Sequence, residues 1–464
     1  MNVLIITPND KKYSLEYNYA ARENLGIEYL LKAIREQNQN AHSINLNIEV
    51  INLQEVLDNT FFEIVGFSLQ FWENRKSYIQ LLNSLKFDLQ SLVIIGGHAS
   101  TLAPIYFLNK CIRLDGVVMG EGESTIKDLI EKIDNLLSVK GIYTREGFSK
   151  RYLLPIDELS FPERDEFLRF YSITNAKAKE IYFSSSRGCP YDCTFCSVKS
   201  FYKTSHHHQY RYRSVTNVKS ELEILFSNHP DIIYLSFTDD NFLGCEQKHI
   251  ARGLEIAEFI NCQKPDILFE FACRVDSIDR DSFKRFADLG LYGVFLGIES
   301  GSQEILNSYN KKTSIKENIN AIETLTEIGI GCDLGFIMLS EKTHIHHVRE
   351  NLVFLKSVME NFDVYVHPVT TFRAEKIYPK DLGVSFLTKD EDEYPLVQEV
   401  ALYKNFMNDI WSTSYKDSFL NLEKLSIEKD EQIFIEKSRR LTKDLIHDAF
   451  SILNDIENSH SISV

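Results

Sequence analysis

The sequence predicts an α/β protein with three parts: a Rossmann-like domain, a partial (β/α)6 barrel and a mainly helical C-terminal region. Short apolar runs alternate with helix-like stretches over the first 140 residues, and a second alternating series begins near residue 179. Such alternation is typical of parallel sheets that are covered by helices. The length of 464 residues and the hydrophobic content of 44% fit about two to four globular domains, and they exclude intrinsic disorder as the main state.

The first domain is expected over residues 1–140. Its predicted strands are the apolar runs at residues 3–7, 48–53, 62–68, 92–96 and 116–119, and helices are predicted at residues 26–36 and 78–85. In doubly wound sheets, ligands bind beyond the carboxyl ends of the strands. Small or polar residues follow the predicted strands here, namely Ser68, Gly96, Gly97, Gly120 and Glu121.

The second series predicts a closed or partly open barrel over residues 179–370. Its strand candidates are residues 180–186, 232–238, 268–273, 293–298, 332–338 and 364–369. Helices are predicted between them, at residues 218–226, 250–260, 280–289, 315–327 and 347–358. Residues 141–178 are punctuated by proline, lack periodicity and are expected to be a connector. Residues 371–464 are expected to be mainly helical, with a strongly charged stretch at residues 423–446.

Charge and the N-terminus indicate the compartment and the partners. The net charge of -16 argues against a broad electrostatic grip on nucleic acid. No apolar run reaches the roughly 18 residues of a membrane span, and the N-terminus shows no basic region or cleavage site of a secretory signal. We therefore expect a cytoplasmic protein with no nucleic-acid or membrane partner, in which the eight cysteines stay reduced.

Three of the cysteines have the spacing of metal ligands. Cys189, Cys193 and Cys196 form a C-x3-C-x2-C segment directly after the first strand of the barrel. Three thiolates so close in sequence can surround one soft-metal centre. Because zinc prefers four ligands and no other cysteine lies nearby in the sequence, the spacing favours a [4Fe-4S] cluster with one iron left open. A zinc site with a distant fourth ligand and a loop of ordinary buried cysteines are the alternatives.

The segment from Arg187 to Cys196 resembles the cluster loop of the radical S-adenosylmethionine (SAM) superfamily, and the resemblance extends over roughly residues 178–370. It implies that the three cysteines hold a [4Fe-4S] cluster whose open iron binds the amino and carboxylate groups of SAM. It also implies a cofactor contact for Phe195, which precedes the third cysteine. Reductive cleavage of SAM would give a 5'-deoxyadenosyl radical that abstracts a hydrogen atom, while the protein orients the reactants. The electron would come from a donor such as flavodoxin or ferredoxin.

Other positions match the same family. Asp239 and Asp240 begin a D-D-N-F segment that resembles the family's loop near the SAM amino group. Glu299 and Ser300 lie in a G-I-E-S-G-S segment that resembles the family's contact to the ribose or methionine part of SAM. Arg274 is a candidate contact to the SAM carboxylate or to the substrate. The structural alternatives are a turn or helix cap for the two segments and an ion pair for Arg274.

The first domain resembles the cobalamin-binding domain that precedes the barrel in one large radical SAM subgroup. The matching pieces are residues 25–30, 65–68, 95–98 and 120–123, in that order, followed by residues 161–164 of the connector. The resemblance implies bound cobalamin, whose nucleotide tail would meet Ser68, Gly96 and Gly97. The sequence contains no D-x-H-x-x-G motif. The absence of this motif is common in the subgroup, and it also fits a domain that has lost the cofactor. His98 is expected to be a hydrogen-bonded turn residue rather than a cobalt ligand.

The leading interpretation is a cobalamin-dependent radical SAM methyltransferase that acts on an unactivated carbon of a small natural product or a peptide. The alternative is a non-methylating radical SAM epimerase, dehydratase or cyclase with a degenerate cobalamin domain. An epimerase needs a hydrogen donor, for which Cys273, Cys332 and Cys245 are candidates, although Cys273 and Cys332 fit equally well as apolar core residues. A third class is a non-enzymatic iron–sulfur or cobalamin sensor. The loops at residues 336–341 and 370–375 depart from the subgroup pattern, so the substrate is not assigned.

Overall fold

The computed structural model describes residues 1–9, 23–151, 153–174, 179–202, 210–362, 364–365, 398–410 and 431–461. These residues belong to two compact units. The first unit contains Met1–Lys177 and Ser197–Arg213, and the second contains Ala178–Cys196 and most of the chain after Arg213. The chain therefore enters the second unit, returns to the first and then enters the second again.

The first unit is built on a six-stranded sheet with the order β2-β1-β3-β4-β5-β6. Strands β1 to β5 pair in parallel, whereas β6 pairs antiparallel with β5. The strands are β1 Asn2–Thr7, β2 Asn40–Asn45, β3 Ile64–Ser68, β4 Leu92–Gly96, β5 Gly116–Val118 and β6 Ile142–Tyr143. The predicted parallel sheet is confirmed, and the structure adds an antiparallel edge strand from the region expected to be a connector.

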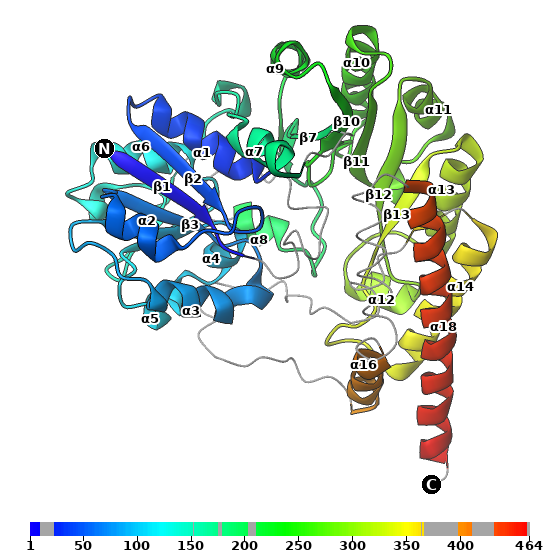
Figure 1. The fold of residues 1–464 in the computed structure, drawn as a ribbon. Helices are drawn as coiled ribbons and strands as arrows, with labels where there is room; N and C mark the ends of the chain where they lie inside the picture. The colour runs from blue at the N-terminus through cyan, green and yellow to red at the C-terminus, as the bar shows by residue number, and fades with distance from the viewer. Residues whose placement is uncertain are drawn as a thin grey trace. The chain divides into compact units, whose positions relative to one another are not determined.

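Helices cover both faces of this sheet (Figure 1). On one face, α1 and α6 pack with Val3, Ile5 and Ile64 in a continuous apolar core, and α3 and α5 lie along the other face. The helices are α1 Leu25–Arg35, α2 Leu53–Asn59, α3 Arg75–Ser84, α4 His98–Leu102, α5 Pro104–Lys110, α6 Glu123–Glu131, α7 Asp165–Thr174 and α8 Val198–Tyr202. Short 3-10 turns lie at Trp72–Asn74, Leu136–Ser138 and Ile156–Glu158, and β9 spans Tyr210–Tyr212. The helices predicted at residues 26–36 and 78–85 are confirmed by α1 and α3.

The prediction of a strand at residues 48–53 is wrong. The second strand is β2, Asn40–Asn45, and α2 begins at Leu53. β2 is an edge strand in which only Ile44 and Asn45 are buried, so its sequence carries almost no apolar signal. Asn52 accepts a hydrogen bond from the backbone N–H of Glu55 at 3.4 Å and so caps α2. Asn52 therefore starts a helix at Leu53, the last residue of the apolar run that was predicted to be a strand.

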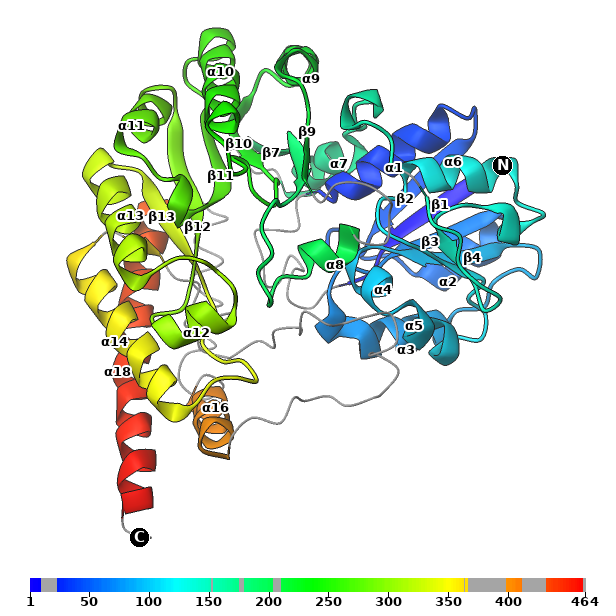
Figure 2. The same cartoon turned by 180° about the vertical axis from the view of Figure 1, so that it is seen from behind.

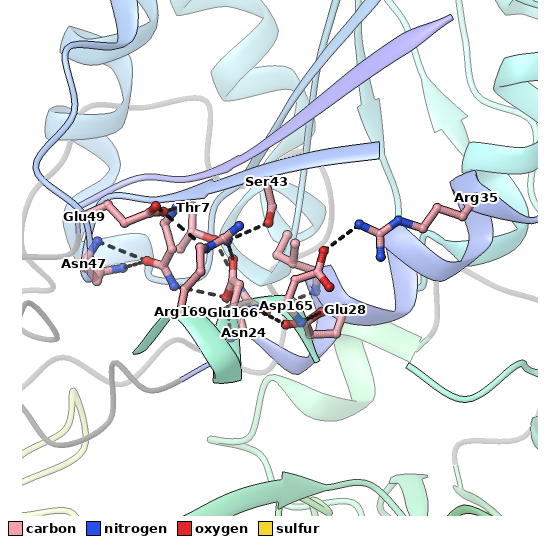
Figure 3. A network of polar contacts seen from close by, with 12 residues as sticks. Thr7, Asn24, Glu28, Arg35, Ser43, Asn47, Glu49, Asp165, Glu166 and Arg169 are labelled. Atoms are coloured by element: carbon pink, nitrogen blue, oxygen red, sulfur yellow. Dashed lines mark hydrogen bonds and ion pairs between the residues drawn. The ribbon is translucent and has the colours of Figure 1, made fainter. Parts of the chain in front are cut away.

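A buried polar network joins the N-termini of α1 and α7 (Figure 3). Glu28 on α1 accepts the backbone N–H groups of Asp165 and Glu166, at 3.1 and 2.6 Å. In return, Glu166 on α7 accepts the backbone N–H of Asn24, the residue before α1, at 2.8 Å. Each helix thus supplies the carboxylate that caps the other. The region expected to be a connector therefore contains a helix that is fixed to the first unit.

The second unit is built on a six-stranded sheet with the order β14-β13-β12-β11-β10-β7, in which all neighbours are parallel. The strands are β7 Lys179–Phe183, β10 Ile232–Phe237, β11 Leu268–Arg274, β12 Leu291–Glu299, β13 Gly331–Phe336 and β14 Val364–Tyr365. Each of the six predicted strands is found, although residues 366–369 of the last lie outside the described residues. Between the described ends of β7 and β14 there is no pairing, so the barrel is of the partly open kind.

The helices of the second unit are α9 Val215–Asn228, α10 Gln247–Gln263, α11 Arg280–Asp288, α12 Gln303–Ser308, α13 Ile315–Ile328, α14 Ile345–Asn361, α16 Gln398–Ile410 and α18 Glu431–Ser461. Of these, α10, α11, α13 and α14 lie along one face of the sheet (Figure 2), whereas α16 packs against α14 and α18. β8 spans Ser186–Gly188, and a 3-10 turn spans Val275–Ser277. All five helices predicted within the barrel are confirmed. The charged stretch predicted at residues 423–446 enters α18 at Glu431, and its earlier residues lie outside the described chain.

Aromatic contacts identify the face of this sheet that the helices cover. Phe271 of β11 lies 5.5 Å from Phe286 of α11, and Phe336 of β13 stacks on Phe354 of α14 at 6.1 Å, measured between ring centroids. Successive side chains of a strand point to opposite faces. The residues that alternate with Phe271 on β11 and with Phe336 on β13 therefore point to the other face of the sheet, which is called the inward face. Among the described helices, none is both long and apolar enough to cross a bilayer.

Candidate active site

The three cysteines lie in one loop of the second unit, between β8 and α8. This cysteine loop, residues 189–196, is held by the turn that follows α12. The backbone N–H of Thr194 donates to the carbonyl of Tyr309 at 2.8 Å, and the side chain of Asn310 donates to the carbonyl of Asp192 at 2.9 Å. The turn that holds the loop thus comes from a segment more than a hundred residues later in the chain.

Arg274, at the end of β11, reaches the cysteine loop. Its Nη1 donates to Cys193 Sγ at 3.5 Å, and its guanidinium carbon lies 3.8 Å from the ring centroid of Tyr191. Its Nε and Nη2 also donate to the two carboxylate oxygens of Asp276, at 2.9 and 3.0 Å. The structure therefore brings Arg274 together with the cysteines, as a fixed and paired cation beside a sulfur atom.

A second cation, Lys311, borders the same loop. Its Nζ lies 2.8 Å from Glu299 Oε1 and 5.8 Å from the ring centroid of Phe195, and the Phe195 ring packs on Tyr309 at 5.1 Å. Gly297 makes room for the ion pair, because a Cβ there would lie 2.8 Å from Glu299 Oε1 and 2.9 Å from Lys311 Nζ. The sequence reasoning missed Lys311, since nothing in an Asn-Lys-Lys turn marks it as a site residue.

The donor set fits an iron–sulfur cluster better than a single ion. Burial raises the pKa of the Cys189 and Cys193 thiols, while Lys311 and Arg274 oppose that rise at Cys193 and so favour its thiolate. Within the described chain, the three sulfur atoms do not form a group compact enough for one ion. A cluster in which each iron takes one thiolate requires such a wider arrangement. The zinc alternative therefore loses support.

The D-D-N-F segment packs against the start of the cysteine loop. Asp239 is buried and accepts hydrogen bonds from the N–H and the hydroxyl of Ser185, at 3.0 and 2.8 Å, and from the hydroxyl of Ser186. Burial raises the pKa of Asp239. Its carboxylate joins the ends of β7 and β10, so its position favours the structural alternative over a contact to SAM.

Asp240 and Asn241 lie closer to the first cysteine. Asp240 Oδ2 accepts the backbone N–H of Gly188 at 2.9 Å, and Asn241 Nδ2 donates to Cys189 Sγ at 3.8 Å. Asp240 is exposed, in contrast to the buried Asp239. Asn241 was missed as a site residue, although it lies within the recognised segment.

Ser300 is also a structural residue. It is fully buried and donates to Asn351 Oδ1 at 2.7 Å, and the same oxygen accepts the backbone N–H of Gly301 at 2.8 Å. Only Glu299 of this segment lies beside the cysteine loop, and its backbone adopts a positive φ of 69°. The structure thus separates the two candidates of the G-I-E-S-G-S segment.

Cys273 and Cys332 lie on the face of the sheet that the helices cover. Cys273 points to the same face as Phe271, and Cys332 points to the same face as Phe336, because the members of each pair lie an even number of positions apart on the strand. Both thiols are buried. Burial raises the pKa of both thiols, to about 12 for Cys332. The expectation that they donate hydrogen to a substrate loses support, because the sheet separates them from the inward face that carries Glu299. Their positions favour the apolar-core alternative.

In the first unit, the glycines at the end of β4 have a packing role. Gly97 has a φ of 93°, and a Cβ there would lie 2.7 Å from the carbonyl oxygen of Leu69. A Cβ on Gly96 would lie 3.5 Å from the Cβ of Val118. At the end of β3, Ser68 Oγ accepts a hydrogen bond from Gln70 at 2.6 Å. The strand ends therefore approach one another closely without bulky side chains.

Ser197, Phe201 and Arg211 contact residues at the same edge of the first sheet. His98 Nε2 shares a 2.7 Å hydrogen bond with Ser197, and its ring stacks on Phe201 at 5.0 Å. Burial lowers the pKa of His98 to about 4, so the ring is neutral. Glu121 forms an ion pair with Arg211. His98 is hydrogen-bonded, as expected, but it is the first residue of α4 and does not lie in a turn.

The same edge includes Gly120, which has a φ of 68°. Its backbone N–H donates to Thr101 Oγ1 at 3.0 Å. The five strand-end candidates of the first unit therefore occupy one edge, and several of their polar groups already have protein partners.

Comparison with known proteins gives the barrel a family. The sequence profile of the radical SAM superfamily matches residues 183–352. An uncharacterized methyltransferase of Pyrococcus horikoshii is 22% identical over 440 residues, which cover 91% of this chain and 92% of the relative. The hopanoid C-3 methylase of Methylococcus capsulatus is 28% identical over 350 residues, which cover 73% of this chain and 64% of the relative.

Both units together resemble a solved structure. The cobalamin-dependent S-adenosylmethionine radical enzyme OxsB, with aqua-cobalamin and S-adenosylmethionine bound, has a TM-score of 0.63 to this chain at 21% identity. The match covers 90% of this chain and 56% of the OxsB chain, so this chain spans just over half of that protein. The profile match identifies residues 183–352 as a radical SAM domain, so the barrel is that of a radical SAM enzyme, which uses SAM and a [4Fe-4S] cluster.

Proposed function

We propose that the chain is a cobalamin-dependent radical SAM methyltransferase that replaces a hydrogen atom on an unactivated carbon with a methyl group. One observation carries the proposal: a doubly wound sheet with small residues at its strand ends and a barrel with a three-cysteine loop occur in one chain. The names of the two relatives support methyl transfer. The aqua-cobalamin bound to OxsB supports a corrinoid site in the first unit.

In the second unit, Cys189, Cys193 and Cys196 would hold the [4Fe-4S] cluster. When bound, this cluster supplies the electron that cleaves SAM to a 5'-deoxyadenosyl radical. Arg274 places a fixed positive charge beside the Cys193 sulfur. Glu299, held by Lys311, is positioned to meet the polar part of SAM.

The remaining candidates have different roles in this proposal. The ring of Phe195, within the cysteine loop, packs on Tyr309 and would shield the cofactors from water. Asp240 would contact SAM, while Asp239 and Ser300 shape the loops around it. The substrate would be a small natural product or a peptide, and the electron donor a flavodoxin or ferredoxin.

In the first unit, the strand-end residues would border cobalamin, which when bound carries the methyl group. Ser68, Gly96 and Gly97 would border its nucleotide tail at strand ends that lie close together, and Gly120 and Glu121 would flank the next strand end. His98 would not ligate cobalt, because its Nε2 is bonded to Ser197 and its ring is stacked on Phe201. The fit of cobalamin to the strand-end edge of the first sheet thus rests on small residues and not on a ligand to the cobalt.

Cofactor content tests the proposal. The chain is reconstituted without oxygen with iron, sulfide and hydroxocobalamin, and we expect a corrinoid spectrum that survives gel filtration together with formation of 5'-deoxyadenosine. Cys196→Ala should abolish SAM cleavage because it removes a cluster ligand. Cys262→Ala changes an exposed cysteine on α10 and should leave cleavage unchanged. Persisting cleavage in the first variant would refute the cluster assignment.

The second candidate function is a non-methylating radical SAM epimerase, dehydratase or cyclase with a degenerate cobalamin domain. It is favoured by the protein contacts at the edge of the first sheet, where Arg211 pairs with Glu121 and Ser197 bonds to His98. The exposed Cys245 is then the remaining candidate for a hydrogen donor. SAM cleavage without corrinoid uptake would establish this alternative over the methyltransferase.

A further inference from the structure

The inward face of β12 and β13 has few side chains. Its positions alternate with the helix-facing residues of the same strands, and four of them are glycine: Gly293, Gly297, Gly331 and Gly335. The pairing register places Gly293 beside Gly331, Phe295 beside Asp333 and Gly297 beside Gly335. Phe295 and Asp333 are therefore neighbouring side chains, and the positions on either side of them are glycines without a side chain.

Phe295 presents an apolar surface on this face. Its side chain is 50% exposed, which is unusual for a phenylalanine in the middle of a parallel strand. The ring leans over Gly335, where a Cβ would lie only 2.8 Å from its Cζ. Gly335 therefore makes room for the ring, which any side chain at that position would displace.

Two carboxyl groups share this face: Asp333 is the pairing partner of Phe295, and Glu270 is the pairing partner of Gly293. Glu270, on the same face of β11, accepts hydrogen bonds from Ser236 and Tyr292 at 2.8 and 2.9 Å. Asp333 is different, because its Oδ1 is buried and has no hydrogen-bond partner in the described chain. Burial and the nearby Glu270 carboxylate raise the pKa of Asp333 to about 7. A buried carboxyl oxygen without a donor is costly, so it indicates a missing partner.

We propose that the substrate carries a cationic nitrogen, such as an amine, that binds Asp333 and Glu270 while its apolar part lies on Phe295. A cation there would supply the missing donor to Asp333 and would offset the repulsion between the two carboxylates. This inference rests on the proposed function, since it assigns the substrate class of the same barrel.

The position of this acidic site also limits the substrate's length. Asp333 lies three residues before Phe336, which is paired with Glu299 beside the cysteine loop. Three strand residues span about 10 Å. A substrate bound at the acidic site would therefore extend about 10 Å from its nitrogen along the strand to reach the level of Glu299.

Two small probes of matched shape test the inference. Binding of 2-phenylethylamine and of neutral 2-phenylethanol to the reconstituted enzyme with SAM is measured by isothermal titration calorimetry. We expect saturable binding of the amine. Asp333→Asn should weaken it about tenfold or more, because the charge-assisted bond is lost, and should leave binding of the alcohol unchanged. Asp288→Asn, an exposed change at the end of α11, is the matched control and should alter neither affinity.

A second variant reports whether the probes occupy this face. Phe295→Ala should weaken binding of the amine and of the alcohol by a similar factor, because both rest on the ring. The inference is overturned if the amine shows no saturable binding up to about 10 mM, or if it binds equally well to the wild type and Asp333→Asn. Formation of 5'-deoxyadenosine and uptake of corrinoid by the same preparations report on the proposed function separately, so either idea can fail alone.

Discussion

At the residue scale, Arg274 shows how one side chain can both shape and charge a loop. Its paired bonds to Asp276 hold the guanidinium plane, and Tyr191 of the cysteine loop lies against that plane. One nitrogen is left to reach Cys193. A lysine could not make these contacts together, because its ammonium group is a point charge and not a planar fork.

We expect Arg274→Gln to make the [4Fe-4S] cluster harder to reduce. A nearby cation stabilises the added electron, so its removal shifts the midpoint potential to a more negative value. The potential is measured by a redox titration followed by electron paramagnetic resonance. Arg280→Gln, which changes an exposed arginine paired with Glu327 on the helix layer, is the control. An unchanged potential in Arg274→Gln would show that the guanidinium positions the loop without tuning the cluster.

The sequence could predict the cysteines because their spacing is local. Lys311 could not be found in this way, since only the folded chain brings a turn after α12 to the cysteine loop. Asp239 and Ser300 illustrate the opposite limit. Their motifs are recognisable, but the sequence does not reveal that both side chains are buried and bonded to neighbouring protein groups.

At the scale of elements, α1 and α7 depend on each other because each supplies a carboxylate to the other's N-terminus. We expect Glu28→Ala to lower the free energy of unfolding of the first unit by about 2 kcal/mol, because two buried N–H groups lose their acceptor. Glu28→Gln keeps an acceptor oxygen and should cost less. Chemical denaturation at about pH 6 measures both changes, with the exposed Glu131→Ala as control. Equal loss in the two Glu28 variants would contradict the capping role.

The same carboxyl group should make stability depend on pH. Burial, together with the nearby Glu166 and Glu23 carboxylates, raises the pKa of Glu28 from 4.5 to about 8. The folded state thus holds the proton more tightly, so this stabilising contribution is complete below pH 4.5 and is lost as the pH rises through 8. We expect the free energy of unfolding to fall as the pH rises from about 4.5 to about 8, and to fall less in Glu28→Gln. An identical slope in the variant would contradict the assignment.

The elements missed by the sequence reasoning share a physical cause. β2 is a polar edge strand, and α7 lies in a proline-rich stretch where its start is set by Glu28 from another helix. Neither depends on a local apolar period, which is the signal that sequence reading uses. The barrel strands and helices were predicted well because each buries one regular face.

At the scale of the whole molecule, the two cofactor sites should respond separately to mutation. We expect Gly97→Val to reduce corrinoid uptake roughly tenfold, because its Cβ would meet the carbonyl of Leu69 at 2.7 Å in a backbone conformation that valine avoids. SAM cleavage should persist, since the cysteine loop belongs to the second unit. Visible spectra and 5'-deoxyadenosine assays measure the two outcomes.

Gly26→Ala provides the control for this prediction. Its added Cβ would meet only Asn24 Oδ1, at 3.4 Å, so both activities should be retained. Normal corrinoid uptake by Gly97→Val would mean that the cofactor does not depend on the turn after β4. Loss of both activities would instead indicate a global folding defect, which thermal unfolding of the variant would reveal.

The path of the chain between the units has an evolutionary consequence. The cysteine loop belongs to the second unit, and the residues that directly follow it, Ser197–Arg213, belong to the first. A single recombination point anywhere in the gene therefore leaves one unit without part of its chain. Descendant proteins that no longer bind a corrinoid are expected to keep the first unit as a scaffold and to diverge by point substitution at its strand ends. Deleting that unit would also remove Ser197–Arg213, the segment that anchors the end of the cysteine loop.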